Sequence, residues 1–147
     1  MIFMRWDVEF PRKVLWVSRH KPLNAELKFL EKKLGKYELE ILNKPIPSAE
    51  WLLENKIKPE KIDIVIPVLP LSIVARLTEL SRRHNFQIWW ADMQLLHNDK
   101  SIVCPEFDPD RDAMVEGRDE KGNKIYRHYR FRTFKRIKKI KLELEDI

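Results

Sequence analysis

Apolar runs and helical periodicities alternate along the first two thirds of the chain. Residues 61–84 hold the clearest example, because the β-branched run at 62–68 is typical of a strand buried on both faces. Proline has no N–H to donate to a central strand, so we expect Pro67 and Pro70 to end this strand near Ile66. A helix is predicted next, because one face repeats at helical spacing: Ile73, Leu77, Leu80 and His84.

The same alternation predicts four parallel strands, at residues 13–18, 37–42, 62–67 and 86–91. Between them, Asn24 is a suitable N-cap for a helix that Gly35 ends, and Ser48 is a suitable cap for a short helix. Strands that alternate with helices are the pattern of α/β folds with right-handed crossovers. We therefore predict one domain, residues 1–147, with a Rossmann-like three-layer sandwich over residues 13–93 and a mainly parallel sheet.

The N-terminal residues and the last third of the chain follow other patterns. Alternating apolar and charged residues predict an edge strand before Pro11, with Trp6, Val8 and Phe10 on one face.

Polar residues and two prolines make residues 98–112 a predicted loop. Two strand-like stretches then flank a turn at 119–123, so we predict a C-terminal antiparallel β-hairpin within residues 113–144, with a bulge or bend near Lys138.

Composition narrows the class of protein. A hydrophobic content of 44% with 35% charged residues is typical of a soluble globular chain. No apolar run is long enough to cross a membrane, and the first residues lack the pattern of a signal peptide. The single cysteine, Cys104, excludes an intrachain disulfide, so we expect a cytoplasmic protein. Three glycines leave no Gly-rich phosphate loop, while abundant Lys and Glu indicate a thermophilic source.

Positive charge is concentrated in the predicted hairpin. Residues 118–141 hold eleven Lys and Arg against Asp119 and Glu120, a net charge of +9, whereas the whole chain carries +6. Interleaved aromatic residues favour nucleic-acid binding through Arg127, Arg130, Arg132, Arg136, Lys138 and Lys139. The alternative is a solvated edge strand, where Lys and Arg prevent edge-to-edge pairing.

A candidate site lies at the carboxyl edge of the predicted parallel sheet, where strand exits meet and ligands bind in α/β folds. The residues delivered there are Ser18, Arg19, His20 and Lys21 after the first strand, Asn43 and Lys44 after the second, Leu69, Pro70, Leu71 and Ser72 after the third, and Asp92 after the fourth. The cations suit an anionic ligand, and Ser72 offers a hydroxyl near a helix N-terminus. His20 can exchange a proton at neutral pH. The alternative is that Arg19 pairs with an acid and His20 faces water.

The sequence predicts no metal site and no cofactor. His20, His84, His97 and Cys104 do not have the spacing of metal ligands, and the close pair His97 and Cys104 lacks further ligands nearby in the sequence. The acidic residues between 92 and 112 are interpreted as a solvated loop, and the alternative is that they bind a divalent ion.

Two segments carry a resemblance to a known family. VLWVSRHKPLNAELKFLEKKLG, with its Ser18-Arg19-His20 element, and IDIVIPVLPLSIVARL, with Leu69, Pro70 and Leu71, resemble small CRISPR-associated ring-nuclease proteins over residues 13–93. The resemblance implies a CARF-like fold, a homodimer, a role in antiviral defence and the binding or metal-independent cleavage of cyclic oligoadenylates. It also implies that Ser18, Arg19 and His20 hold phosphate while the loop 69–72 shapes the pocket. The basic C-terminal hairpin has no counterpart in this resemblance.

Two functional hypotheses follow. In the first, the protein binds a nucleotide or cyclic oligonucleotide, and a ribose 2′-OH attacks its neighbouring phosphate while Arg19 and Lys44 stabilise charge and His20 transfers a proton. In the second, it is a non-enzymatic accessory protein that binds nucleic acid through residues 118–141.

Overall fold

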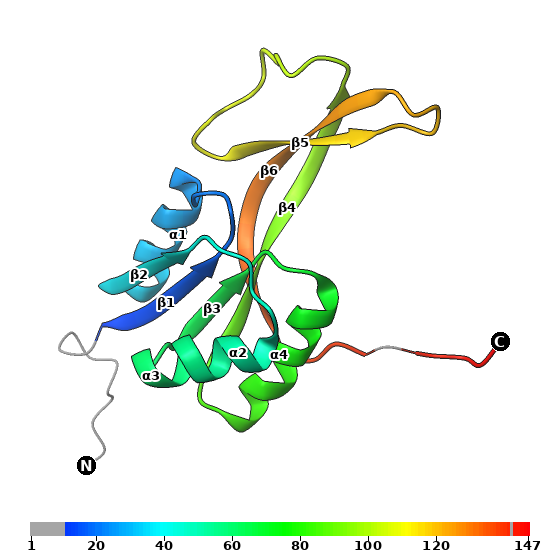
Figure 1. Ribbon diagram of the computed structural model, residues 1–147. Coiled ribbons are helices and arrows are strands. Elements are labelled where there is room, and N and C mark those ends of the chain that lie inside the picture. The colour runs from blue at the N-terminus through cyan, green and yellow to red at the C-terminus, as the bar shows by residue number, and fades with distance from the viewer. Residues whose placement is uncertain (1–10, 142) are drawn as a thin grey trace. The chain divides into compact units, whose positions relative to one another are not determined.

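A computed structural model describes residues 11–141 and 143–147, so the strand predicted around Trp6, Val8 and Phe10 lies outside the described residues. The described residues have a mixed α/β fold with one six-stranded sheet in the order β2-β1-β3-β4-β6-β5 (Figure 1). The strands are β1 (Arg12–Val17), β2 (Tyr37–Leu42), β3 (Ile64–Pro67), β4 (Gln87–Asp99), β5 (Asp112–Arg118) and β6 (Lys124–Ile137). The helices are α1 (Asn24–Leu34), α2 (Ala49–Leu52), the π-helical turn η1 (Leu53–Ile57), α3 (Lys58–Glu60) and α4 (Leu71–Arg83).

The expected parallel pairing of the first four strands is confirmed. β1 pairs with β2 and with β3, and β3 pairs with β4, all in parallel. Val17 has Leu42 and Pro67 as its register partners, so β1, β2 and β3 end at the same edge of the sheet. Pro67 ends β3, and the next N–H, that of Val68, donates to the carbonyl of Val17 at 2.8 Å.

The chain divides into two compact units. Unit 1 contains the described residues of 1–21, 34–90 and 135–147, and unit 2 contains residues 22–33 and 91–134. Both β4 and β6 contribute residues to each unit. The two units are described separately below.

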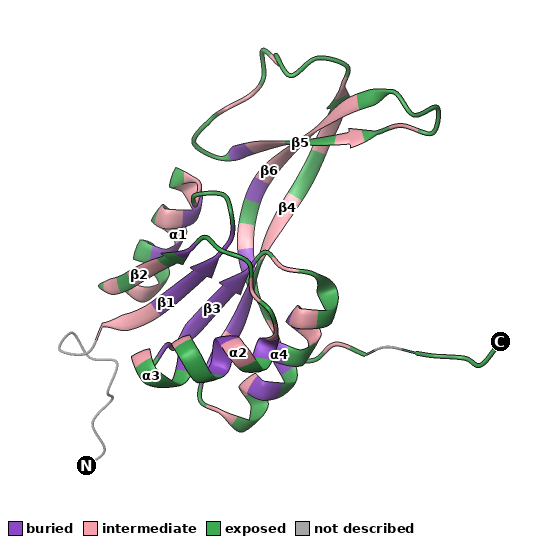
Figure 2. Cartoon of the chain, in the orientation of Figure 1, coloured by how far each residue is buried: buried purple, intermediate pink, exposed green. Residues whose placement is uncertain are grey.

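Unit 1 buries β1 and β3 on both faces, which matches the apolar character of their sequences (Figure 2). On one face, Leu15 and Val65 join a core that also contains residues of α2, η1 and α4. On the other face, Val14 and Ile64 are at most 1% exposed. With both faces apolar, residues 14–17 of β1 and 64–67 of β3 carry no polar side chain.

The predicted helix caps have mixed outcomes. Ser48 is the N-cap of α2, as predicted, and its hydroxyl accepts a hydrogen bond from the N–H of Trp51 at 3.0 Å. Gly35 has a positive φ of 72° directly after α1, which is the conformation that favours glycine at a helix end. Asn24 is the first residue of α1 and not its cap, since the N–H of Leu27 donates to the carbonyl of Leu23 at 3.0 Å. The side-chain amide of Asn24 donates to Asp110 at 2.8 Å.

Two predictions for the last third of the chain need correction. The fourth strand does not end at Ala91, since β4 continues to Asp99. Its second half is half-buried or exposed and lacks an apolar pattern, so backbone pairing and not hydrophobicity extends it. The predicted bulge or bend near Lys138 is replaced by the end of β6 at Ile137. The hairpin itself is confirmed, because β5 and β6 pair antiparallel.

Among the described residues, no helix combines the length and the apolar character that crossing a membrane requires.

The core of unit 1 gives a first prediction. Leu15 is fully buried, so the substitution Leu15→Ala should lower the free energy of unfolding by about 2–5 kcal/mol through lost transfer energy and a residual cavity. Urea denaturation measures the change. Leu144→Ala, at a side chain that is 91% exposed, should change stability by less than about 0.5 kcal/mol. Equal effects of the two substitutions would contradict this description of the core.

Glu26 gives a second prediction, in unit 2. Its carboxylate accepts the N–H of Leu23 at 2.9 Å at the start of α1, yet the residue is only 5% exposed. Burial raises the pKa of this carboxyl above its ordinary value, and the hydrogen bond from Leu23 only partly opposes that change. A raised folded-state pKa contributes stability below the unfolded-state pKa and loses it as the pH rises through the folded-state value.

Glu26→Gln should therefore raise the melting temperature at about pH 7, because the amide can still accept the Leu23 N–H without a buried charge. The advantage should shrink as the pH falls through the raised pKa of Glu26, where the carboxyl itself becomes protonated. Thermal denaturation across this range measures both effects. An advantage that grows toward low pH would contradict the assignment.

Candidate functional site

The carboxyl edge of unit 1 brings together three of the four predicted strand exits. Because β2, β1 and β3 are neighbours in parallel register, the segments that follow Leu42, Val17 and Pro67 leave the sheet side by side. The segment after β1 is ordered by two hydrogen bonds: Ser18 Oγ accepts the N–H of His20 at 3.0 Å, and Trp16 Nε1 donates to the His20 carbonyl at 2.9 Å. The backbone conformation of the Ser-Arg-His element is thus fixed by the Ser18 hydroxyl and the Trp16 indole.

The side chains at this edge differ in exposure. Ser18 is buried, while the cations and the polar residues around it are exposed: Arg19, His20, Lys21, Asn43, Lys44 and Ser72. Lys44 Nζ lies 5.0 Å from the ring centroid of Trp51, in cation–π contact. Leu69 packs against the core, Pro70 is the N-cap residue of α4, and Leu71 is 56% exposed. The edge therefore presents cations and apolar surface to solvent.

Asp92 does not belong to this edge. It lies inside β4, five residues after its start at Gln87, and not in a loop after a strand. The prediction that Asp92 follows a strand exit is wrong because the apolar run at 86–91 marks only the first part of the strand.

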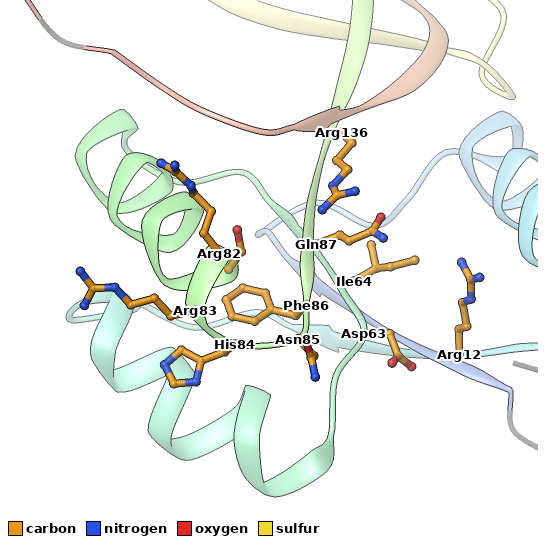
Figure 3. A pocket seen from close by; sticks show the side chains of 11 residues that line it. Arg12, Asp63, Ile64, Arg82, Arg83, His84, Asn85, Phe86, Gln87 and Arg136 are labelled. Atoms are coloured by element: carbon orange, nitrogen blue, oxygen red, sulfur yellow. The ribbon is translucent and has the colours of Figure 1, made fainter. Parts of the chain in front are cut away.

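A pocket of about 640 Å³ lies at the opposite, amino edge of unit 1 (Figure 3). Its walls come from the first residues of β1, β3 and β4, the last turn of α4 and the end of β6. Four arginines line it, Arg12, Arg82, Arg83 and Arg136, and Asp63 is the one acid among the described residues that do so. Figure 3 shows Arg136 pointing toward Gln87. With His84 neutral, the lining carries a net charge of +3.

The basic residues of the predicted hairpin have different environments. Arg130 is bound to Asp112, with Nε 2.7 Å from Oδ1 and its second nitrogen 2.9 Å from Oδ2. Arg127 lies against Gly117, where a side chain would collide with its guanidinium. Arg132, Lys138 and Lys139 are exposed, and Arg136 lines the amino-edge pocket. The hairpin is therefore not a uniform basic face, because Arg130 has a structural partner.

Unit 2 contains a cluster that the sequence analysis did not find. His97 and Asp99 on β4, Cys104 in the following loop and His128 on β6 offer ligand atoms that all lie within 4.8 Å of one another. The close pair His97 and Cys104 thus does have further ligands of the right type, but His128 is supplied by a strand 24 residues after Cys104. The signal in the sequence that could have indicated this cluster is His128, a further histidine in the predicted hairpin.

The second nitrogen of each histidine faces a carboxylate. His128 Nε2 lies 2.7 Å from Asp112 Oδ2, and His97 Nδ1 lies 3.1 Å from Asp99 Oδ1. The side chains of His128 and Asp112 are completely buried. The hydrogen bonds from Arg130, against the opposing effect of burial, hold the pKa of Asp112 well below its ordinary value, so its carboxylate is ionised. His and Cys side chains with ordered second nitrogens are the ligands that zinc and related transition metals prefer.

Comparison with known proteins adds no relative: no family model matches the chain, and neither the curated proteins nor the solved structures contain a match.

Proposed function

We propose that the protein binds a phosphate-bearing nucleotide, free or within a nucleic-acid strand, in the arginine-lined pocket of unit 1. The observation that carries this proposal is that four arginines and a single acid line one open pocket. Guanidinium groups form bidentate, charge-assisted hydrogen bonds with phosphate oxygens.

The pocket has the size and polarity that such a ligand requires. Its volume of about 640 Å³ is within the range typical of small-molecule sites. Asn85 and Gln87 supply amide groups that can donate to and accept from a base, and Ser81 adds a hydroxyl. The carboxylate of Asp63 accepts the backbone N–H of Lys13 at 2.9 Å, so part of its charge is already compensated.

A second candidate site is the carboxyl edge, where the expected ligand is a cyclic oligoadenylate. The observation in its favour is the common register that ends β2, β1 and β3 together, with Arg19, His20 and Lys44 exposed beyond them. In this hypothesis, the protein is a metal-independent ring nuclease that acts as a homodimer.

The Rossmann-like fold expected from the sequence is part of this second hypothesis. We infer a Rossmann-like three-layer arrangement for residues 13–93, supported by the parallel strand order 2-1-3-4, which is the start of a common doubly wound topology. Burial of both faces of β1 and β3 supports the same inference.

Three variants that each remove three positive charges distinguish the sites. They change to Gln the residues of the pocket (Arg82, Arg83 and Arg136), of the carboxyl edge (Arg19, Lys21 and Lys44) or of the basic hairpin (Arg132, Lys138 and Lys139). Fluorescence anisotropy with a labelled single-stranded RNA of about 12 nucleotides measures affinity. The pocket variant should bind at least about tenfold more weakly, because each charge-assisted hydrogen bond contributes about 1.5–3 kcal/mol. Its salt dependence should also be weaker, since fewer counterions are released.

The other two variants are the matched controls, and each should bind within about twofold of the parent protein, well below a tenfold change. An equal loss in all three would mean that binding follows net charge alone, which would contradict a defined pocket. A loss confined to the hairpin variant would favour the second of the two functional hypotheses, an accessory protein that binds nucleic acid through its hairpin.

The ring-nuclease hypothesis has a separate test. The protein incubated with cyclic tetraadenylate should give linear products at equal rates with and without a chelator. His20→Ala should lower the turnover number at least about tenfold, in the range of general acid–base contributions, with a smaller change in binding. Arg83→Ala, at the amino edge, serves as the control. Absence of cleavage by the parent protein, or cleavage that the chelator abolishes, would refute this hypothesis.

A further inference from the structure

We propose that His97, Cys104 and His128 bind one Zn²⁺ ion in unit 2. The proposal is independent of phosphate binding, because the residues proposed for that function lie in unit 1. It rests on three features of the described residues: the spacing of the donor atoms, the tautomers of the two histidines, and an unpaired carboxylate oxygen beside them.

The spacing of the three donor atoms matches that of a tetrahedral zinc site. Cys104 Sγ lies 3.6 Å from His97 Nε2 and 3.6 Å from His128 Nδ1, and the two nitrogens are 3.1 Å apart. With Zn–N bonds of about 2.0–2.1 Å and a Zn–S bond of about 2.3 Å, tetrahedral angles give N···S edges of about 3.6 Å and N···N edges of about 3.3 Å. An ion at the centre of these atoms would need only small movements of the side chains.

Hydrogen bonds direct the lone pair of each histidine toward this centre. Both oxygens of Asp112 accept hydrogen bonds from Arg130, at 2.7 and 2.9 Å, so the carboxylate acts as an acceptor and its 2.7 Å hydrogen bond places a proton on His128 Nε2. In the neutral ring, His128 Nδ1 is then the lone-pair nitrogen. Asp99 Oδ1 lies 3.1 Å from His97 Nδ1, and a hydrogen bond donated by that nitrogen leaves the lone pair on His97 Nε2. Carboxylate–histidine–metal arrangements of this kind orient the ligand and increase its basicity.

A positive charge between His97 Nε2 and His128 Nδ1 would stabilise these tautomers. Two lone-pair nitrogens 3.1 Å apart repel each other unless a proton or a metal ion lies between them. The His97 and His128 rings are held nearly perpendicular, at 81°, and Phe107 packs against His128 at 5.5 Å between ring centroids. The cluster is therefore preorganised and partly shielded from water.

Two carboxylates lie beside His97. Asp99 Oδ2 is buried and has no hydrogen-bond partner among the described residues, and Glu106 Oε2 lies 3.5 Å from His97 Nε2. Because Asp99 Oδ1 faces His97 Nδ1, the fourth ligand of an ion on His97 Nε2 would be Glu106 or a water. A thiolate and one carboxylate together neutralise a divalent ion.

The donor set selects the class of metal. Imidazole and thiolate ligands favour Zn²⁺ and its neighbours in the transition series, whereas Mg²⁺ and Ca²⁺ require mainly oxygen ligands. A bound zinc would fix the segment 100–111, which has no helix or strand, to β4 and β6 within unit 2 (Figure 1). Its binding energy would then contribute directly to the stability of that unit.

Metal binding by the purified full-length protein tests the proposal. One equivalent of Co²⁺ should produce a thiolate-to-cobalt charge-transfer band with the intense visible absorption of a tetrahedral site, and Zn²⁺ should displace it. Cys104→Ser should abolish the charge-transfer band, and His128→Gln should weaken zinc binding by more than about 100-fold, exceeding the effect of losing an outer-shell partner. His20→Gln and His84→Gln, at histidines outside the cluster, should leave zinc affinity unchanged.

Two further measurements distinguish the loss of a zinc site from the loss of the fold. Asp112→Asn should keep the charge-transfer band but bind zinc about 10–100-fold more weakly, because Asp112 orients His128 without touching the metal. In the unsubstituted protein, Zn²⁺ should slow alkylation of Cys104 by iodoacetamide, and Mg²⁺ should not. Absence of a thiolate–cobalt band in the unsubstituted protein, or alkylation that zinc does not slow, would overturn the proposal.

Discussion

Two-sided burial of β1 and β3 is the constraint on which the architecture of unit 1 depends. Ile64, Val65 and Ile66 are all at most 1% exposed, so successive side chains on both faces are removed from water. Such strands have no position for a polar side chain. The candidate functional residues of unit 1 therefore lie at the two edges of the sheet. Arginines line the amino edge, and the Ser-Arg-His element lies at the carboxyl edge. Both candidate phosphate sites are consequences of the same buried strands.

In unit 2, a buried carboxylate has the organising role. Asp112 is paired in register with Arg130 and lies diagonally from His128 on the same face of the hairpin. It accepts hydrogen bonds from both side chains and from the N–H of Asp108. An isolated buried carboxylate would be strongly destabilising, but here every partner is present. The loop before β5 is thereby held to the hairpin.

The sequence predicted the parts of the fold that hydrophobicity determines. The four parallel strands, the Ser48 cap and the hairpin all follow from apolar runs, capping residues or turn residues. The extension of β4 to Asp99 could not be predicted, because its second half is held by backbone pairing and carries no apolar pattern.

The sites were harder to predict because their residues come from distant segments. Arg12, Arg82 and Arg136 meet only when three elements of unit 1 are assembled. The residues at the carboxyl edge were found because one rule, the common exit of parallel strands, connects them. No such rule joins His97 to His128, whose proximity depends on how the segment after β4 folds back within unit 2.

The strand order also has a consequence for synthesis on the ribosome. β6 lies between β4 and β5 in the sheet, although it is the last strand to be made. Until residues 124–137 emerge, β4 lacks its second neighbour and β5 lacks its antiparallel partner. The nascent chain therefore exposes a long, unpaired strand edge, the kind of surface on which other chains can pair and aggregate. Lysine and arginine residues in β6 are translated last, so the positive charge that opposes such pairing arrives together with the strand that closes the gap.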